Sequence, residues 1–74
     1  MRLKLYGRTY CHLCEEMGQA LRALGVAFDE VDVDSDPALE ARYGELIPVL
    51  ALPDGREICH YRLDEAALGE ALRR

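Results

Sequence analysis

Two cysteines, Cys11 and Cys14, stand three positions apart in a chain of 74 residues. A bond between them would close almost no chain, so it would add little stability through loop entropy. The third cysteine, Cys59, makes the total odd, whereas a secreted disulfide scaffold usually carries an even number spread along the chain. The chemistry open to the pair is therefore reversible thiol–disulfide exchange or metal binding.

The pair lies where a predicted strand gives way to a predicted helix. Residues 2–6 alternate in polarity, and apolar residues then recur at helical spacing from 12 to 24, before Gly25. At a helix N-terminus, free backbone N–H groups and the helix dipole stabilise an anion. We therefore expect Cys11 to ionise more readily than a free cysteine and to attack a substrate disulfide. Cys14, one turn further along, would resolve the mixed disulfide.

Two neighbours of the cysteines are candidates for tuning or binding. His12 lies between them, and a protonated imidazole beside the thiolate would make the pair more oxidising. The alternative is that His12 is an exposed residue of the first turn without such a role. Tyr10 precedes Cys11, and it either covers that cysteine or has a packing role. The spacing leaves both alternatives open.

The other elements follow in a definite order. Residues 26–33 predict a second strand, which with the preceding helix makes a right-handed βαβ unit with parallel strands. The remaining patterns predict a helix capped by Asp36–Pro37 and ending near Gly44, strands over 48–51 and 56–59 about the turn Leu52–Gly55, and a helix over 63–72. The predicted order is β-α-β-α-β-β-α, in a single domain spanning 1–74.

Composition limits the classes of protein. Half of the residues are apolar and 31% are charged, which is typical of a soluble globular protein. The net charge is −5 and the nine basic residues are scattered, which disfavours nucleic acid as a partner. No apolar run approaches the roughly 18 residues of a membrane span, and the N-terminus does not look like a signal peptide. We expect a cytoplasmic monomer.

Together these motifs resemble glutaredoxin and, more narrowly, the short glutaredoxin-like proteins of bacteria that keep the dithiol. The resemblance rests on the strand–Arg8-x-x-Cys11-x-x-Cys14–helix segment, on residues 31–34, on Ile47–Pro48–Val49, and on the hairpin with its closing helix. It implies an α/β thioredoxin fold, with a four-stranded mixed sheet in the order 2-1-3-4 flanked by helices. It also implies disulfide reduction, often of glutathione mixed disulfides.

The resemblance further implies roles for single residues. Cys11 and Cys14 match the redox pair, and Pro48 matches a cis-proline that faces it. A cis bond would turn the backbone of Ile47 toward a peptide or glutathione lying beside the cysteines; the alternative is a proline that merely begins an edge strand. Arg8 matches a basic residue near the thiolate and the glutathione carboxylate.

The chain departs from the glutaredoxin pattern at two places. Leu46 stands where threonine is usual, and Cys59–His60 stand where the family has two glycines that let glutathione approach. Asp64 at the start of the last helix could still hold an amino group. We therefore expect the partner to be either glutathione, as a co-substrate, or a disulfide-bearing protein. We expect no bound cofactor.

Two other classes of function are weighed against the enzyme. A zinc or iron–sulfur module could use Cys11 and Cys14 together with Cys59 and the two histidines, provided that the last strand places Cys59 beside the first helix. A non-catalytic interaction domain could retain the fold without the chemistry. Otherwise Cys59 is most simply a small buried residue of the last strand.

Overall fold

A mixed four-stranded sheet organises residues 1–73, which are the residues that the computed structural model describes. The strands lie in the order β2-β1-β3-β4 and comprise β1 (Leu3–Gly7), β2 (Phe28–Asp32), β3 (Val49–Ala51) and β4 (Glu57–His60). β1 is parallel to β2 and antiparallel to β3, and β3 is antiparallel to β4. The predicted sheet order and mixed pairing are confirmed.

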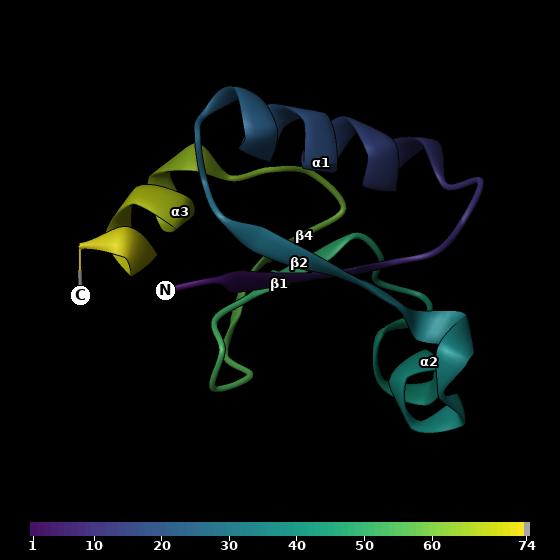
Figure 1. Cartoon of the computed structure of the whole chain (residues 1–74). Helices are drawn as coiled ribbons and strands as arrows, with labels where there is room; N and C mark the ends of the chain where they lie inside the picture. The colour runs from purple at the N-terminus through teal and green to yellow at the C-terminus, as the bar shows by residue number, and fades with distance from the viewer. Residues whose placement is uncertain (74) are drawn as a thin grey trace.

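Helices cover both faces of this sheet. They are α1 (His12–Ala23), α2 (Pro37–Tyr43) and α3 (Glu65–Leu72), with a 3₁₀ turn, η1 (Val33–Ser35), before α2. α1 and α3 lie on one face and α2 on the other, as Figure 1 shows. The predicted element order and the thioredoxin-like α/β fold class are thus confirmed.

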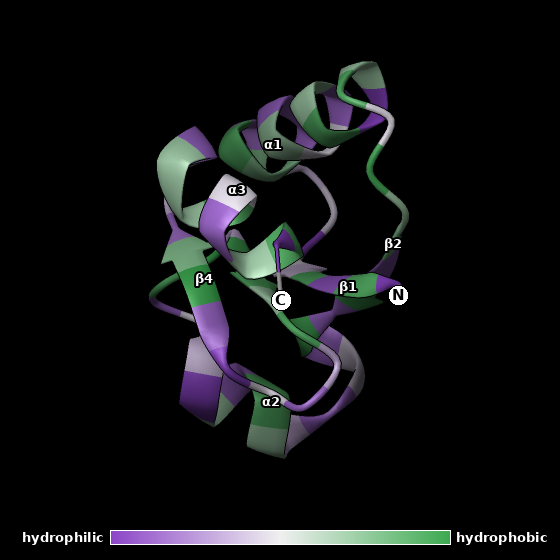
Figure 2. Cartoon of the chain, turned by 90° about the vertical axis from the view of Figure 1, so that its left-hand side faces the viewer, coloured by the Kyte–Doolittle hydropathy of each residue, from purple (hydrophilic) through white to green (hydrophobic). Residues whose placement is uncertain are grey.

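Two apolar clusters, one on each face, hold the layers together. Leu3 and Leu5 alternate along β1 toward α1, where they meet Leu21 and other buried residues. On the opposite face, Tyr6 stacks on Tyr43 of α2 with their ring centroids 4.3 Å apart. In Figure 2 the helices carry apolar and polar bands, as expected of helices that bury one side.

Some boundaries differ from those predicted, because local hydrogen bonds decide them. The second strand begins at Phe28 rather than at 26, since Gly25 adopts a φ of 72° and the Val26 N–H bonds to Leu21 O at 3.0 Å. These contacts close the end of α1. The last helix begins at Glu65 rather than at 63, because Asp64 Oδ1 accepts a bond from Ala67 N at 3.0 Å.

Other local predictions are confirmed. Asp36 caps α2 by accepting a bond from Ala38 N at 2.8 Å, and Pro37 is the first helical residue. The turn before β4 places Gly55 at a φ of 96° and bonds its N–H to Leu52 O. Within residues 1–73 there is no helix with the length and apolar character needed to cross a membrane.

Candidate active site

Cys11 is the N-cap of α1. Its backbone is extended, with φ −95° and ψ 111°, and His12 is the first helical residue. Its Sγ accepts a hydrogen bond from the Cys14 backbone N–H at 3.3 Å. The sulfur therefore occupies the place that an oxygen of Ser or Asp usually takes at a helix N-terminus, as the sequence predicts.

Cys14 is held in the protonated form by its surroundings. Burial, together with the hydrogen bond of its side chain to Cys11, raises the pKa of Cys14 to about 11, and the backbone N–H of Arg8 acts in the opposite direction. The Cys14 thiol is thus a donor that faces the Cys11 sulfur. The two sulfurs have unequal surroundings, because only Cys11 sits at the helix cap.

Gly7 makes room for Cys14. A Cβ at Gly7 would lie 2.9 Å from Cys14 Sγ and 3.1 Å from Cys14 Cβ. Gly7 ends β1 directly beneath the first turn of α1, so any larger residue would push on the sulfur. The sequence does not predict this role, since a glycine after a strand is equally typical of an ordinary turn.

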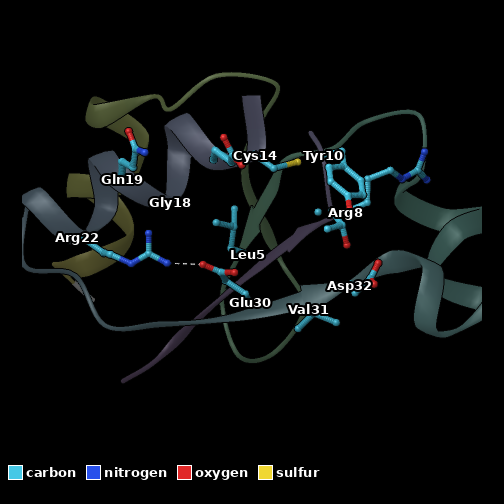
Figure 3. Close-up of a pocket in the computed structure, with 13 residues that line it drawn as sticks. Leu5, Arg8, Tyr10, Cys14, Gly18, Gln19, Arg22, Glu30, Val31 and Asp32 are labelled. Carbon is cyan, nitrogen blue, oxygen red and sulfur yellow. Dashed lines mark hydrogen bonds and ion pairs between the residues drawn. The ribbon is translucent and has the colours of Figure 1, made fainter. Parts of the chain in front are cut away.

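The Arg8 side chain turns away from the dithiol. Its guanidinium lies 3.4 Å from Asp34 Oδ1 and also pairs with Glu40 of α2; Figure 3 shows it directed toward that helix. Its Nε is buried without a hydrogen-bond partner among the described residues. A role beside a substrate carboxylate stays a prediction, and the backbone of Arg8 is what touches Cys14.

Tyr10 and His12 both face solvent. Tyr10 is 98% exposed at a φ of 65°, so both roles considered for it, packing and covering Cys11, are wrong. His12 is also exposed, and its Nε2 lies 3.5 Å from Glu16 Oε2 one turn along α1. Tyr10 borders the same groove as Cys14 (Figure 3). Neither side chain is covered by the described part of the chain.

The segment before β3 runs beside Gly7. The Ile47–Pro48 peptide bond is cis, and Pro48 is buried. Tyr6 pairs with Val49, so one step further along the antiparallel strands Gly7 faces Pro48. Because β3 lies between β1 and β4, the alternative of a proline that begins an edge strand is wrong. Pro48 is thus placed beside the residue on which Cys14 rests.

Asp64 and Cys59 lie apart from the groove that Cys14 borders. Asp64 caps α3, and an additional role in holding an amino group stays a prediction. Cys59 is 8% exposed within the core, as predicted, and burial raises its pKa. His60, which the sequence left without a role, has Nδ1 2.7 Å from Glu57 Oε2.

A groove of about 620 Å³ lies between α1 and β2 and reaches Cys14. Arg22 of α1 and Glu30 of β2 form an ion pair that bridges it at a distance from the cysteine (Figure 3). The sequence does not predict this groove. The only signal is that Glu30 and Asp32 interrupt the apolar pattern of the second strand, so that this strand is only partly covered.

No group of three or more His, Cys, Asp or Glu side chains within the described chain is placed to hold one metal ion. What the site offers instead is two adjacent thiols. Both are partly buried; Cys11 is the N-cap of α1, and the raised pKa of Cys14 keeps that thiol protonated. Such a pair can alternate between a dithiol and a disulfide.

Comparison with known proteins places this site in a family. Residues 2–73 match the family model described as "Glutaredoxin-like domain (DUF836)". Protein Ne2328 from Nitrosomonas europaea is 37% identical, with 95% of this chain and 88% of that one covered and a TM-score of 0.85. Protein XcR50 from X. campestris is 43% identical, with 96% and 95% covered and a TM-score of 0.79.

More distant structures show the fold alone. The buckwheat glutaredoxin solved with glutathione is 20% identical, with 96% of this chain and 67% of that one covered and a TM-score of 0.61. Among curated proteins there is no match. Since the family model spans nearly the whole chain and the dithiol sits at the start of α1, the chain belongs to the glutaredoxin-like domain family.

Proposed function

We propose that this protein is a thiol–disulfide oxidoreductase in which Cys11 is the nucleophile and Cys14 the resolving residue. The observation that carries the proposal is the hydrogen bond from the Cys14 backbone N–H to Cys11 Sγ, at 3.3 Å, at the N-cap of α1. Donors aimed at a sulfur stabilise its thiolate, which is the reactive form. The Cys14 thiol adds a second donor to the same sulfur.

The reaction has two exchanges. The Cys11 thiolate attacks one sulfur of a substrate disulfide, forms a mixed disulfide, and expels the other substrate sulfur as a thiolate. Cys14 then loses its proton and attacks Cys11 Sγ, which forms the Cys11–Cys14 disulfide and releases the second substrate thiolate. The substrate gains two electrons and the protein loses two. The raised pKa of Cys14 makes the second exchange depend on removal of its proton.

The dithiol is restored by a thiol donor, so the reaction needs no bound cofactor. Glutathione or a protein dithiol can supply the two electrons by the same exchange chemistry. The substrate is accordingly a disulfide-bearing protein or a glutathione mixed disulfide. We propose that the protein acts as a cytoplasmic monomer, because disulfide reduction is the direction favoured in that compartment.

Single-cysteine variants test the proposal on a protein disulfide and on a glutathione mixed disulfide. Cys11→Ser is expected to abolish turnover of both, because no nucleophile remains at the cap. Cys14→Ser is expected to retain part of the turnover of the mixed disulfide only, since glutathione can replace the resolving thiol.

Cys59→Ala is the matched control, because it removes the third thiol from the core and leaves the cap unchanged. It is expected to keep both activities. Full activity of Cys11→Ser would contradict the proposal. So would a loss of both activities in Cys59→Ala while the variant remains folded.

A further inference from the structure

The loop that joins β1 to the helix cap, Arg8–Thr9–Tyr10, contains a backbone conformation that has to be held. Tyr10 has a φ of 65°, in the left-handed region that residues other than glycine rarely adopt. Such a conformation persists only where its surroundings fix it. The side chain of Tyr10 gives no such support, because it is 98% exposed. The support therefore comes from its neighbours in the chain, and Cys11 on one side is fixed as the N-cap of α1.

Arg8 fixes the loop on the other side through two carboxylates. Its Nη2 lies 3.4 Å from Asp34 Oδ1 and donates a hydrogen bond to Glu40 Oε2. Asp34 lies in η1 and Glu40 in α2, and α2 covers the face of the sheet opposite to α1. In Figure 1 the loop and α2 lie at the same end of the sheet, on the right. The Arg8 side chain thus ties the loop that leads to the dithiol to elements on the far side of the sheet.

The chain leaves room for the Glu40 carboxylate at the end of α2. A Cβ at Gly44 would overlap all three atoms of that carboxylate group. Gly44 has a φ of −52°, so its backbone does not require glycine. The side chains of Arg8 and Glu40 are 35% and 49% exposed, and ion pairs of this exposure contribute little to stability. A change at Glu40 is therefore expected to leave the fold intact and to act on the loop.

The backbone of Arg8 meets the resolving cysteine. Burial raises the pKa of the Cys14 thiol, and the hydrogen bond from the Arg8 N–H opposes that rise. A donor aimed at a sulfur favours its thiolate, which is the form in which Cys14 attacks Cys11 Sγ. One residue therefore joins two contacts: its side chain holds the loop against α2, and its N–H lies on the sulfur that completes the reaction.

We propose that Arg8 is a positioning residue for the resolving step: its ion pairs with Asp34 and Glu40 hold the loop so that its backbone N–H stays on Cys14 Sγ. This inference rests on the proposed function and concerns its second exchange. The role differs from the one that the resemblance to glutaredoxin implies, in which the guanidinium faces a substrate carboxylate. Here the guanidinium is already paired with two carboxylates of its own chain. Arg8 takes no part in the transfer of electrons.

Rapid mixing of the reduced protein with a disulfide separates the two exchanges. Samples are quenched with acid, and mass spectrometry gives the fraction with a mixed disulfide on Cys11 and the fraction fully oxidised. Oxidised glutathione, which carries carboxylates, is compared with the uncharged hydroxyethyl disulfide. Arg8→Met removes the charge and keeps a long side chain. We expect it to slow the second exchange by about fivefold or more with both disulfides, and to leave the first exchange at the wild-type rate.

Glu40→Gln separates the positioning of the loop from the charge of Arg8. It weakens the ion pair and leaves the guanidinium in place, so it is expected to slow the second exchange by roughly threefold. Added to Arg8→Met it is expected to change little, because two residues of one ion pair do not act additively. Asp29→Asn is the matched control. It removes a carboxylate that pairs with Arg2 and Lys4 at the other end of β1, and it is expected to change neither exchange.

A role of Arg8 in binding a substrate carboxylate predicts a different pattern. Arg8→Met would then slow only the first exchange and only with oxidised glutathione, and Glu40→Gln would speed that exchange by releasing the guanidinium. That pattern, or an unchanged second exchange in Glu40→Gln, overturns the inference while the proposed function stands. Thermal melting shows that each variant is folded, and Glu40→Gln alone decides if Arg8→Met does not fold. If the folded wild-type protein reduces neither disulfide, the proposed function fails and the inference fails with it.

Discussion

At the scale of single residues, the two sulfurs differ because the chain surrounds them differently. Cys11 Sγ accepts the backbone N–H of Cys14, and Cys14 is partly enclosed and points its own proton toward Cys11. Gly7 leaves the space that the Cys14 sulfur occupies, since a Cβ there would lie 2.9 Å from it. The position of the Cys14 sulfur therefore depends on a residue that has no side chain of its own.

Gly7→Ala tests this dependence. Gly7 has no positive φ, so alanine meets no backbone strain there, and its Cβ would lie 2.9 Å from Cys14 Sγ. We expect the sulfur to be displaced and the resolving step to slow by roughly tenfold or more, as is usual for a small misplacement of a reacting group. The measurement is the fraction of mixed disulfide on Cys11, trapped by acid quench and read by mass spectrometry.

Gly18→Ala is the matched control, because its Cβ would meet nothing closer than 3.5 Å. It also places an alanine inside a helix, where alanine is preferred over glycine. Its mixed disulfide is expected to resolve at close to the wild-type rate. Equal resolution by Gly7→Ala and wild type would show that Gly7 does not position Cys14.

Prediction from the sequence succeeds at this scale where a residue acts through its chemical type. Cys11 at the cap and Cys59 in the core both follow from type and spacing. Prediction fails where contacts between residues distant in the sequence determine the role of a residue. The Arg8 guanidinium pairs with Asp34 and Glu40, and Gly7 leaves room for Cys14. Both contacts join residues that meet only after folding.

At the scale of elements, the residues at helix N-termini give the clearest local signals of structure in this sequence. Cys11, Asp36 and Asp64 each accept a backbone N–H at the beginning of a helix. The sequence predicts two of these caps correctly, since Asp36–Pro37 and the strand before Cys11 mark the starts clearly. It places the third helix two residues early, because Leu63 continues the apolar pattern while Asp64 sets the cap.

Substitutions of Asp64 separate the stability that comes from its capping hydrogen bond from the stability that comes from its charge. Asp64→Ala removes the acceptor for Ala67 N, and we expect the free energy of unfolding to fall by about 1 kcal/mol. Asp64→Asn keeps an acceptor of similar capping strength, so its stability is expected to stay within a few tenths of a kcal/mol of wild type. The measurement is urea unfolding. If Asn were as destabilising as Ala, the charge of Asp64 and not its cap would be the stabilising feature.

At the scale of the whole molecule, the topology brings distant segments to one end of the sheet. The end of β1, the cis bond before β3 and the residue after β4 form one row, and the start of α1 lies above it. The βαβ pattern predicts the parallel pairing of β1 with β2, and the hairpin predicts the antiparallel pairing of β3 with β4, because parallel strands need a long crossover and antiparallel ones a short turn. That β1 lies beside β3 is implied only by the resemblance to glutaredoxin.

Strand order alone does not predict the groove between α1 and β2 or the orientation of the Tyr61 ring. The groove exists because β2 is an edge strand whose polar residues leave it partly uncovered. The Tyr61 hydroxyl donates to Glu45 O and its backbone N–H donates to Pro48 O, and a single sequence does not predict either contact. Both features depend on how the helices and strands pack against one another.

The three cysteines have different surroundings in the folded chain, so alkylation of all three tests whether they differ in reactivity. At pH 7, a thiol with a pKa of about 11 is a thiolate in roughly one molecule in ten thousand, against a few per cent for a free cysteine. We therefore expect iodoacetamide to label Cys11 roughly a hundredfold faster than Cys14, with Cys59 protected by burial. In concentrated urea the three rates should become similar, because the helix cap and the enclosure are lost. Labelling of Cys14 before Cys11 in the folded protein, or a preference for Cys11 that persists in urea, would contradict the assignment of Cys11 as the nucleophile.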